Sequence, residues 1–456
     1  MTNKPHNIIN ILIIPLILIS LLIFSGSSSA SPLLMGRITS VHPYGAQDAS
    51  RNPALLVWQQ QENAIGLLVD YQTNVSTAIN NLNSDAFVNL NIDNYVLSPR
   101  LSYIYNKNKW ALGCDINTDY NMLQNHAQIY SKNAGLDTLS QFLINNNSLS
   151  TSCTISAGRA LNSHNSLGIQ LNAGYSKNSY NKNNDTNKKK TLIFSGPLNI
   201  AYETNKVTQE QITVNPGIGY LGKIENSEIG LMFTAGRLMW EQDTEKKQSL
   251  NTISANSFAH AKGKLPFSFM YSLGPGIIAG SFSNLADIVN FGLELGITFP
   301  VRYKYPSLEQ IGDQYPYNSF FKSGNLQLDN KISNYPFVAL RGGVEFLMTS
   351  YAVLSLGGGL NSINILSRSR GGLVPPVLRN NRKYQKLMSI YGTAGVDFLI
   401  GRRTIITVGT VLSHNSLSIE EIKYQQIPPN NLVFHRVNSK IKVFTVDTFV
   451  ALSFGF

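Results

Sequence analysis

Hydrophobic and polar residues alternate along most of this chain, most clearly at its C-terminal end. Because successive side chains of a β-strand point to opposite faces, a period of two predicts strands. In the terminal segment, one face carries Phe444, Val446, Thr448, Val450, Leu452, Phe454 and Phe456, and the other carries Thr445, Asp447, Ala451, Ser453 and Gly455. The same alternation predicts strands at 65–71, 85–106, 167–175, 192–202, 212–220, 291–305, 338–348, 388–400 and 404–412. We therefore expect an all-β fold.

The composition indicates where such a sheet would lie. Only 14% of the residues are charged, while the chain has 35 Gly, 21 Tyr and 21 Phe. This balance favours a transmembrane antiparallel β-barrel with one face toward lipid and one toward a lumen, although a secreted β-sandwich has a similar composition. The terminal strand, with Phe454 and Phe456, resembles the signal by which bacterial outer-membrane barrels are recognised for assembly. The resemblance implies the barrel assembly machinery as a partner.

The N-terminal 30 residues have the organisation of a secretory signal peptide. Lys4 is followed by an apolar run over 8–24 and a small-residue stretch over 25–31, with Ser28 and Ala30 at an A-x-A-like cleavage site. The alternative is an uncleaved membrane anchor, because the run is nearly long enough to span a bilayer. We expect residues 1–30 to be removed, residues 31–62 to precede the barrel, residues 63–456 to form it, and the protein to reside in the outer membrane.

The connections between strands predict the barrel's orientation. Short turns are expected at 349–351 and 401–403, and long external loops at 241–263, 305–335, 364–385 and 415–438. The pattern gives about fifteen strand candidates, whereas a bacterial barrel normally closes with an even number. One candidate, expected within 190–223, must therefore merge with a neighbour or be something other than a strand. Fourteen strands are expected, and sixteen are possible.

Charge and cysteine content add little chemistry. The formal net charge is +11, and for an exported protein the anionic neighbour we expect is lipopolysaccharide rather than nucleic acid. The Arg and Lys residues over 367–386 fit a solvated loop, or a site for phosphates or an acidic ligand. Cys114 and Cys153 could form a disulfide or remain two free thiols. No metal site is expected.

The residues before the first strand do not alternate. Asn52 is a good helix N-cap and Pro53 is favoured at the first helical position, so a short helix over 54–60 is expected. Alternatively, Asn-Pro opens a turn into the barrel.

This segment also resembles a known family. The run Gly45-Ala46-Gln47-Asp48-Ala49-Ser50, followed by Asn52-Pro53-Ala54-Leu55, looks like the N-terminal hatch of the FadL-type long-chain fatty-acid transporters. That resemblance implies a fourteen-stranded barrel whose lumen is plugged by the hatch and which passes hydrophobic molecules inward. Related spirochaete proteins and a Bacteroidetes secretion subunit share such an N-terminus. The candidate hatch or gating residues are Gly45, Asp48, Ser50, Asn52, Pro53 and Ala54.

Charged residues also occur at positions whose parity places them inside the barrel. Charges buried in a lumen need partners, so we expect these residues to hold plug and wall together, with cargo selection as the alternative. The candidates are Glu294, Arg302, Arg341, Glu345, Asp397 and Asp447.

Catalytic chemistry is not evident. The mature chain's histidines are scattered at His42, His126, His164, His260, His414 and His435, and His164-Asn165-Ser166 fits a turn better than a hydrolase site. We expect no catalytic residue, no cofactor and no enzymatic activity.

The expected function is passive transport of hydrophobic or amphipathic, fatty-acid-like small molecules by a monomer. A surface adhesin, structural protein or secretion-machine docking subunit is the alternative, suggested by the polar, basic loops. A water-filled general porin is a third class.

Overall fold

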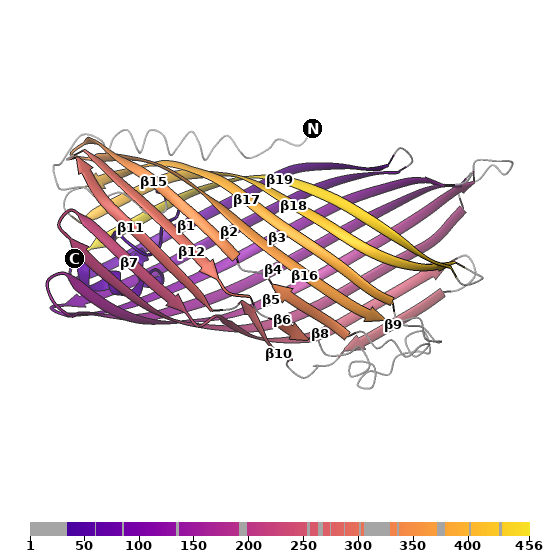
Figure 1. Ribbon diagram of the computed structural model, residues 1–456, viewed down its shortest axis with the longest axis horizontal. Helices are drawn as coiled ribbons and strands as arrows, with labels where there is room; N and C mark the ends of the chain where they lie inside the picture. The colour runs from indigo at the N-terminus through magenta and orange to yellow at the C-terminus, as the bar shows by residue number, and fades with distance from the viewer. Residues whose placement is uncertain are drawn as a thin grey trace.

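The structure is a computed structural model. It describes residues 34–59, 61–83, 86–133, 136–190, 198–252, 256–262, 268–273, 275–286, 288–300, 302–304, 329–334, 337–371, 379–400, 403–427 and 431–456. Over these residues the chain forms one long antiparallel β-barrel, as Figure 1 shows. The expected signal peptide, residues 1–30, lies outside the described residues. Among the residues described, no helix has both the length and the apolar character needed to cross a membrane.

The barrel sheet consists of nineteen strand segments. They are β1 (Asn63–Asn83), β2 (Ala86–Lys107), β3 (Trp110–Asn133), β4 (Leu136–Ala160), β5 (Asn165–Lys190), β6 (Leu198–Ile224), β7 (Ser227–Thr234), β8 (Arg237–Thr252), β9 (Asn256–Lys262), β10 (Ser268–Leu273), β11 (Gly276–Ala286), β12 (Val289–Thr298), β13 (Arg302–Lys304), β14 (Asp329–Asn334), β15 (Phe337–Thr349), β16 (Ala352–Gly371), β17 (Arg379–Ile400), β18 (Thr404–Ile427) and β19 (Asn431–Gly455).

Several segments are parts of one barrel strand. The C-terminal part of β6 pairs with β7, and its N-terminal part pairs with β8. On their other side, β7 pairs with β11, and β8 pairs with β9 and β10. Likewise β12 continues into β13, and β14 into β15. Joined in this way, the segments give a closed barrel of fourteen strands, as the sequence predicted.

The interruptions coincide with residues that cannot continue a ladder. Gly236, with φ of 97°, lies between β7 and β8. Pro275 precedes β11, and Pro300 follows β12. Proline has no N–H to donate, and a positive φ favours glycine. The same part of the wall includes Pro216 on β6, whose carbonyl accepts a bond from the N–H of Ala235 at 3.0 Å.

The barrel closes between its first and last strands. β1 pairs with β19 in an antiparallel register from Ala64 opposite Gly455 to Asn74 opposite Thr445. The terminal residue extends the ladder. The N–H of Phe456 donates to the carbonyl of Asn63 at 2.9 Å, and the carbonyl of Phe456 accepts a bond from the N–H of Asn63 at 3.2 Å. Over the described residues, β1 and β19 are therefore paired with each other, and a strand structure inside a membrane requires such closure.

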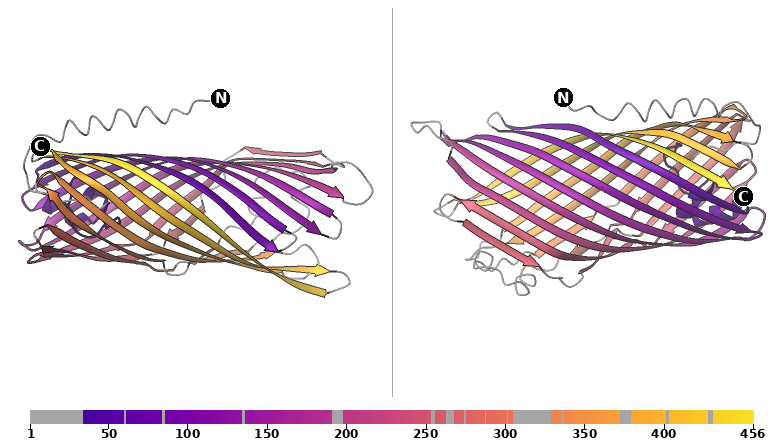
Figure 2. Two further views of the ribbon diagram at one scale, coloured as in Figure 1. Left: turned by 90° about the horizontal axis from the view of Figure 1, so that it is seen from above. Right: turned by 180° about the vertical axis from the view of Figure 1, so that it is seen from behind.

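One end of the barrel has a lipid-facing belt. Along β1, Ile65, Leu67, Val69 and Tyr71 are exposed on the outer face, while Ala64, Gly66 and Leu68, which alternate with them, are buried. Equivalent exposed apolar residues occur on the outer face of β3, β5, β7, β12 and β19. The belt lies beside the short turns, at what we call the turn end. A transmembrane strand needs only about 9–11 residues, whereas β6 has 27, so the strands extend well beyond the belt at the opposite, extended end (Figure 2).

These extensions correct the predicted long loops. Residues 241–252 belong to β8 and 256–262 to β9, residues 364–371 and 379–385 belong to β16 and β17, and residues 415–427 and 431–438 belong to β18 and β19. Of the predicted loop at 305–335, residues 329–334 form β14, and 305–328 lie outside the described residues. Polar residues on both strand faces remove the alternation, yet the ladder continues because each strand still has a neighbour.

Other strand predictions are confirmed. The predicted short turn at 349–351 separates β15 from β16. Of the predicted turn at 401–403, between β17 and β18, only residue 403 is among the described residues. Residues 85–106 correspond to one strand, β2. The surplus candidate within 190–223 merges into the single strand β6, with residues 191–197 outside the described part of the chain. His164 lies in the turn between β4 and β5.

Candidate functional site: an occluded lumen

Residues 34–59, which we call the luminal segment, lie inside the barrel at its turn end (Figure 2). The segment contains two short 3₁₀ helices, η1 (Ala46–Ser50) and η2 (Pro53–Trp58). It is almost wholly buried: Leu34, Met35, Leu55 and Leu56 have no exposed surface. Because η1 and η2 contact β1 to β6 and β19, the segment fills the lumen rather than covering its mouth.

The local sequence explains the two helices. Asn52 caps η2 as predicted, accepting a bond from the N–H of Ala54 at 3.1 Å, with Pro53 in the first position. The helix is 3₁₀ and ends at Trp58, shorter than the predicted 54–60. The carboxylate of Asp48 accepts bonds from the N–H groups of Tyr44 at 2.6 Å and Gly45 at 3.3 Å, at the start of η1.

Buried polar side chains tie the segment together. Arg51 donates to the carboxylate of Asp48 and to the carbonyls of Val41 at 2.6 Å, His42 at 3.1 Å and Ile38 at 3.2 Å. The Asn52 side chain donates to the carbonyls of Ser40 at 2.8 Å and Tyr220 at 3.0 Å, so it also joins the segment to β6. Most of these bonds go to carbonyls of the irregular stretch 38–42, whose backbone groups need partners once they are buried.

Glycines on the inner wall make room for the segment. A Cβ added at Gly357 would lie 2.1 Å from the nitrogen of Gly36, and one added at Gly230 would lie 2.0 Å from the carbonyl oxygen of Ser40. Both distances are far below van der Waals contact, so any side chain there would displace the segment. Further glycines with close contacts to it are Gly66, Gly113, Gly158, Gly168, Gly219, Gly280, Gly292, Gly343, Gly395 and Gly409. The inner wall is thus shaped for close contact with both backbone and side-chain atoms of the segment.

Glu294 on β12 provides the densest polar contact between wall and segment. Its carboxylate accepts bonds from the N–H groups of Thr39 and Ser40 at 2.7 Å each and from the Ser40 hydroxyl at 2.7 Å. Arg341 on the neighbouring β15 donates to the same carboxylate at 3.0 Å and to the carbonyl of Arg37 at 3.2 Å. Two predicted lumen charges therefore pair with each other and with the segment.

Three more predicted carboxylates face the same segment. Asp397 accepts a bond from the hydroxyl of Tyr44 at 3.1 Å, and Asp447 accepts one from Arg37 at 3.3 Å. A Glu345 carboxylate oxygen lies 3.7 Å from Nε2 of His42, whose ring stacks on Phe282 with centroids 4.0 Å apart. Arg302 belongs to β13, at the pairing position opposite Ser333, and its side chain lies outside the described residues.

The other predicted hatch residues lie at the wall as well. A Cβ at Gly45 would lie 2.7 Å from the hydroxyl of Ser453, Pro53 touches Gly168, and the carbonyl of Ala54 accepts a bond from Ser166 at 2.8 Å. Ser50 bonds only within η1, to the carbonyl of Gln47 at 3.3 Å, in the part of the chain described. Sequence reasoning missed Arg37, Arg51 and Tyr44, because residues outside a regular element have no parity from which to infer a direction.

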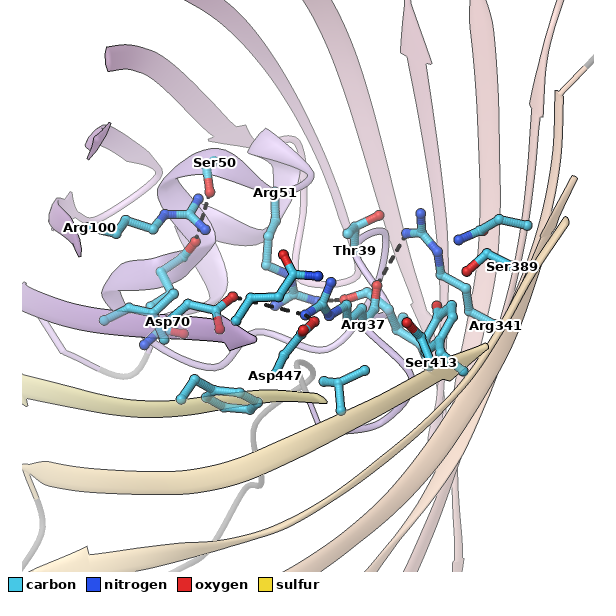
Figure 3. A pocket seen from close by; sticks show the side chains of 18 of the residues that line it. Arg37, Thr39, Ser50, Arg51, Asp70, Arg100, Arg341, Ser389, Ser413 and Asp447 are labelled. Carbon is cyan, nitrogen blue, oxygen red and sulfur yellow. Dashed lines mark hydrogen bonds and ion pairs between the residues drawn. The ribbon is translucent and has the colours of Figure 1, made fainter. Parts of the chain in front are cut away.

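A cavity of about 560 Å³ adjoins the segment. Its lining includes Arg37 and Thr39 from the segment, Asp70 from β1, Arg341 from β15 and Asp447 from β19, as the close-up in Figure 3 shows. Gly66 on β1 contacts Ala46 in η1, and Ser453 on β19 contacts Gly45, the residue before η1. Along the same two strands, Asp70 and Asp447 lie farther from the short turns than Gly66 and Ser453 do. The cavity therefore lies on the side of the segment that faces the extended end.

The cysteines do not form a cross-link. Both Cys114 and Cys153 are free thiols, and they lie diagonally on β3 and β4, where Cys114 is opposite Ile155 and Cys153 is opposite Ile116. Within the described ranges no cluster of three or more His, Cys, Asp or Glu side chains is arranged to hold a metal ion.

Comparisons with known proteins support the fold. No protein-family model and no curated protein matches the sequence. Among solved structures, the Pseudomonas putida toluene transporter TodX is 11% identical with a TM-score of 0.55, and the alignment covers 94% of this chain and 99% of that one. A Pseudomonas aeruginosa FadL homologue is 11% identical with a TM-score of 0.52 over 95% and 99% of the two chains. The Ralstonia pickettii toluene transporter TbuX is 11% identical with a TM-score of 0.50 over 94% and 98%. The chain thus has the FadL-type barrel fold.

Proposed function

We propose that this protein is an outer-membrane channel that passes hydrophobic or amphipathic small molecules down their concentration gradient, with the luminal segment as its gate. The observation that carries the proposal is a transmembrane barrel whose lumen is filled by its own N-terminal segment, held by buried polar contacts beside a cavity. Such a barrel blocks free passage of water and ions. It also provides a place where a ligand can pause before it passes.

The structural neighbours support the class of cargo. Two of the three compared structures are described as toluene transporters and the third as a FadL homologue. Toluene is a small apolar molecule, and the sequence resemblance suggested a fatty-acid-like cargo. We therefore propose a passive route that needs no nucleotide, metal or enzymatic step.

The candidate residues receive roles within this proposal. Gly45, Asp48, Asn52, Pro53 and Ala54 hold the gate in its closed form, and Ser50 stabilises η1. We also propose that the barrel assembly machinery recognises Phe454 and Phe456, and that the extended end of the barrel contacts lipopolysaccharide. Cell fractionation tests the location: recovery of the folded protein in the inner membrane or in soluble fractions would contradict it.

Uptake into proteoliposomes tests the transport. Radiolabelled toluene and a long-chain fatty acid should enter vesicles that contain the protein faster than protein-free vesicles, and a variant lacking residues 35–63 should show altered uptake. Uptake equal to that of empty vesicles for both probes would overturn the proposal. Large steady ion conductance of the unmodified protein in planar bilayers would instead support a water-filled porin. A stoichiometric protein partner in detergent extracts would favour a docking or adhesive role.

A further inference from the structure

The charges around the cavity are not evenly balanced. Arg51 pairs with Asp48, Arg100 with Asp115 at 2.6 Å, and Arg341 with Glu294 at 3.0 Å. Each of these three cations has a carboxylate of its own, and each pair is neutral as a unit. The lining residues outside these pairs that carry formal charge are Arg37, Asp70 and Asp447.

Arg37 is shared by two carboxylates. Its guanidinium lies 3.3 Å from Oδ2 of Asp447 and 4.0 Å from Oδ2 of Asp70, as Figure 3 shows. These three residues, which we call the Arg37 triad, carry a net charge of −1 when both carboxylates are ionised. A net charge in a partly enclosed space of low dielectric attracts a counter-charge more strongly than it would in water.

The triad also has unused hydrogen-bonding capacity. Within the described part of the chain, Oδ1 of Asp70 and Oδ1 of Asp447 are buried and accept no hydrogen bond. The Asp447 side chain is only 9% exposed, yet it lines the cavity. A buried carboxylate oxygen without a donor is unfavourable, and both residues line the cavity, so rotation of either carboxylate would bring its free oxygen to a donor on a molecule there. In contrast, the Arg37 side chain is 41% exposed, which leaves room for a ligand beside it.

Apolar side chains line another part of the cavity. Leu68, Val411 and Phe449 line it and pack together in one buried cluster with Leu34. Two acceptors with an excess negative charge therefore lie in one cavity with an apolar surface. An ammonium group offers three donors and a positive charge, and an alkyl chain attached to it would pack on the apolar residues.

We propose that this cavity binds molecules that carry a primary ammonium group on an alkyl chain, with the ammonium bound by Asp70 and Asp447 on the cavity side of the Arg37 guanidinium. The inference rests on the proposed channel function. It narrows the class of cargo to positively charged amphipathic molecules, whereas toluene is neutral and an ionised fatty acid is negatively charged. In this proposal the molecule first binds in the cavity and then passes through the barrel.

Isothermal titration calorimetry of the folded protein in detergent tests this directly. The probes are n-butylammonium, butanoate and butan-1-ol, each corrected by titration into protein-free micelles. We expect n-butylammonium to bind and butanoate not to bind. Asp447→Asn and Asp70→Asn should each weaken n-butylammonium binding roughly tenfold to a hundredfold, as expected for loss of a charged hydrogen bond.

The double variant gives the sharpest result. Replacing both aspartates changes the triad from −1 to +1, so the protein should lose n-butylammonium binding and gain butanoate binding. The control is Glu225→Gln, which removes one charge from an exposed residue in the turn between β6 and β7, outside the cavity. It should leave both affinities unchanged.

The outcomes separate the two proposals. Equal or no binding of n-butylammonium and butanoate by the unmodified protein would overturn the ammonium site, and this result does not depend on any variant folding. If toluene or fatty-acid uptake persists in that case, the channel function stands. If n-butylammonium binds selectively but neither cargo is taken up, the site stands and the proposed channel function fails.

Discussion

Replacing Glu294 by Gln should release the luminal segment from the wall. The carboxylate accepts bonds from the N–H groups of Thr39 and Ser40 and pairs with Arg341. An amide keeps one acceptor oxygen but presents an NH₂ group where a second acceptor is needed, and it leaves Arg341 without its carboxylate. Glu294 is 2% exposed, so solvent cannot replace these contacts.

The size of the effect follows from the loss of a buried ion pair. Removing one partner of such a pair costs about 3–5 kcal/mol. Since about 1.4 kcal/mol corresponds to a tenfold change in an equilibrium constant, the detached form of the segment should gain roughly a hundredfold to a few thousandfold in relative population. The barrel strands themselves should persist, because their ladders do not include this carboxylate.

Single-channel recording in planar bilayers measures the change. The unmodified protein should conduct little, whereas Glu294→Gln should show long open events. Glu62→Gln is the matched control, because Glu62 is exposed beside the segment and only its backbone carbonyl bonds to the wall. If the folded Glu294→Gln variant conducts no more than the control, the carboxylate does not hold the segment and this reasoning is refuted.

Three further changes test other contacts of the segment and the barrel end. Gly357→Ala should displace residues 34–36, since its Cβ would lie 2.1 Å from the Gly36 nitrogen; faster limited proteolysis within 34–59 is expected, and an unchanged cleavage rate would contradict it. Asn52→Ala removes a helix cap, worth about 1 kcal/mol, and leaves the carbonyls of Ser40 and Tyr220 without this donor; hydrogen exchange at Ala54 and Leu55 should accelerate, with Ser50→Ala as the milder comparison. Phe456→Ala should lower the fraction of folded, heat-modifiable barrel in cells, and equal amounts of folded protein would argue against a role for this residue in assembly.

The sequence predicted the wall better than its contents. Period-two alternation predicted Glu294 and Arg341 on the inner face, because parity follows directly from strand geometry, and in the structure both side chains contact the luminal segment. Parity could not show that both residues would meet Thr39, Ser40 and the carbonyl of Arg37, since that depends on the path of an irregular segment. The extended strands were missed for a related reason. Stretches such as 241–248 are polar on both faces, so no alternation marks them.

The Asn-Pro pair predicted a helix start, and Asn52 caps η2. The glycines opposite the segment gave no comparable signal, because a single glycine in a strand also marks a bulge or a bend. Only the three-dimensional register shows that Gly219 on β6 and Gly230 on β7 face the same part of the segment, around Asn52 and Ser40. Contacts of this kind depend on strands that are distant from the segment in sequence.

The contacts of the segment also indicate where it should open. Glycine in a strand interior costs roughly 0.5–1 kcal/mol relative to alanine, so we expect packing of the segment against the inward glycines to offset part of this cost. Expelling the whole segment would lose all of this contact together with the buried bonds of Arg51 and Asn52, neither of which is more than 9% exposed. Arg37 differs, because its side chain is 41% exposed at the cavity and its two carboxylates bind it at 3.3 and 4.0 Å. We therefore expect a ligand at the Arg37 triad to move only the residues around Arg37, while η1 and η2 remain in place.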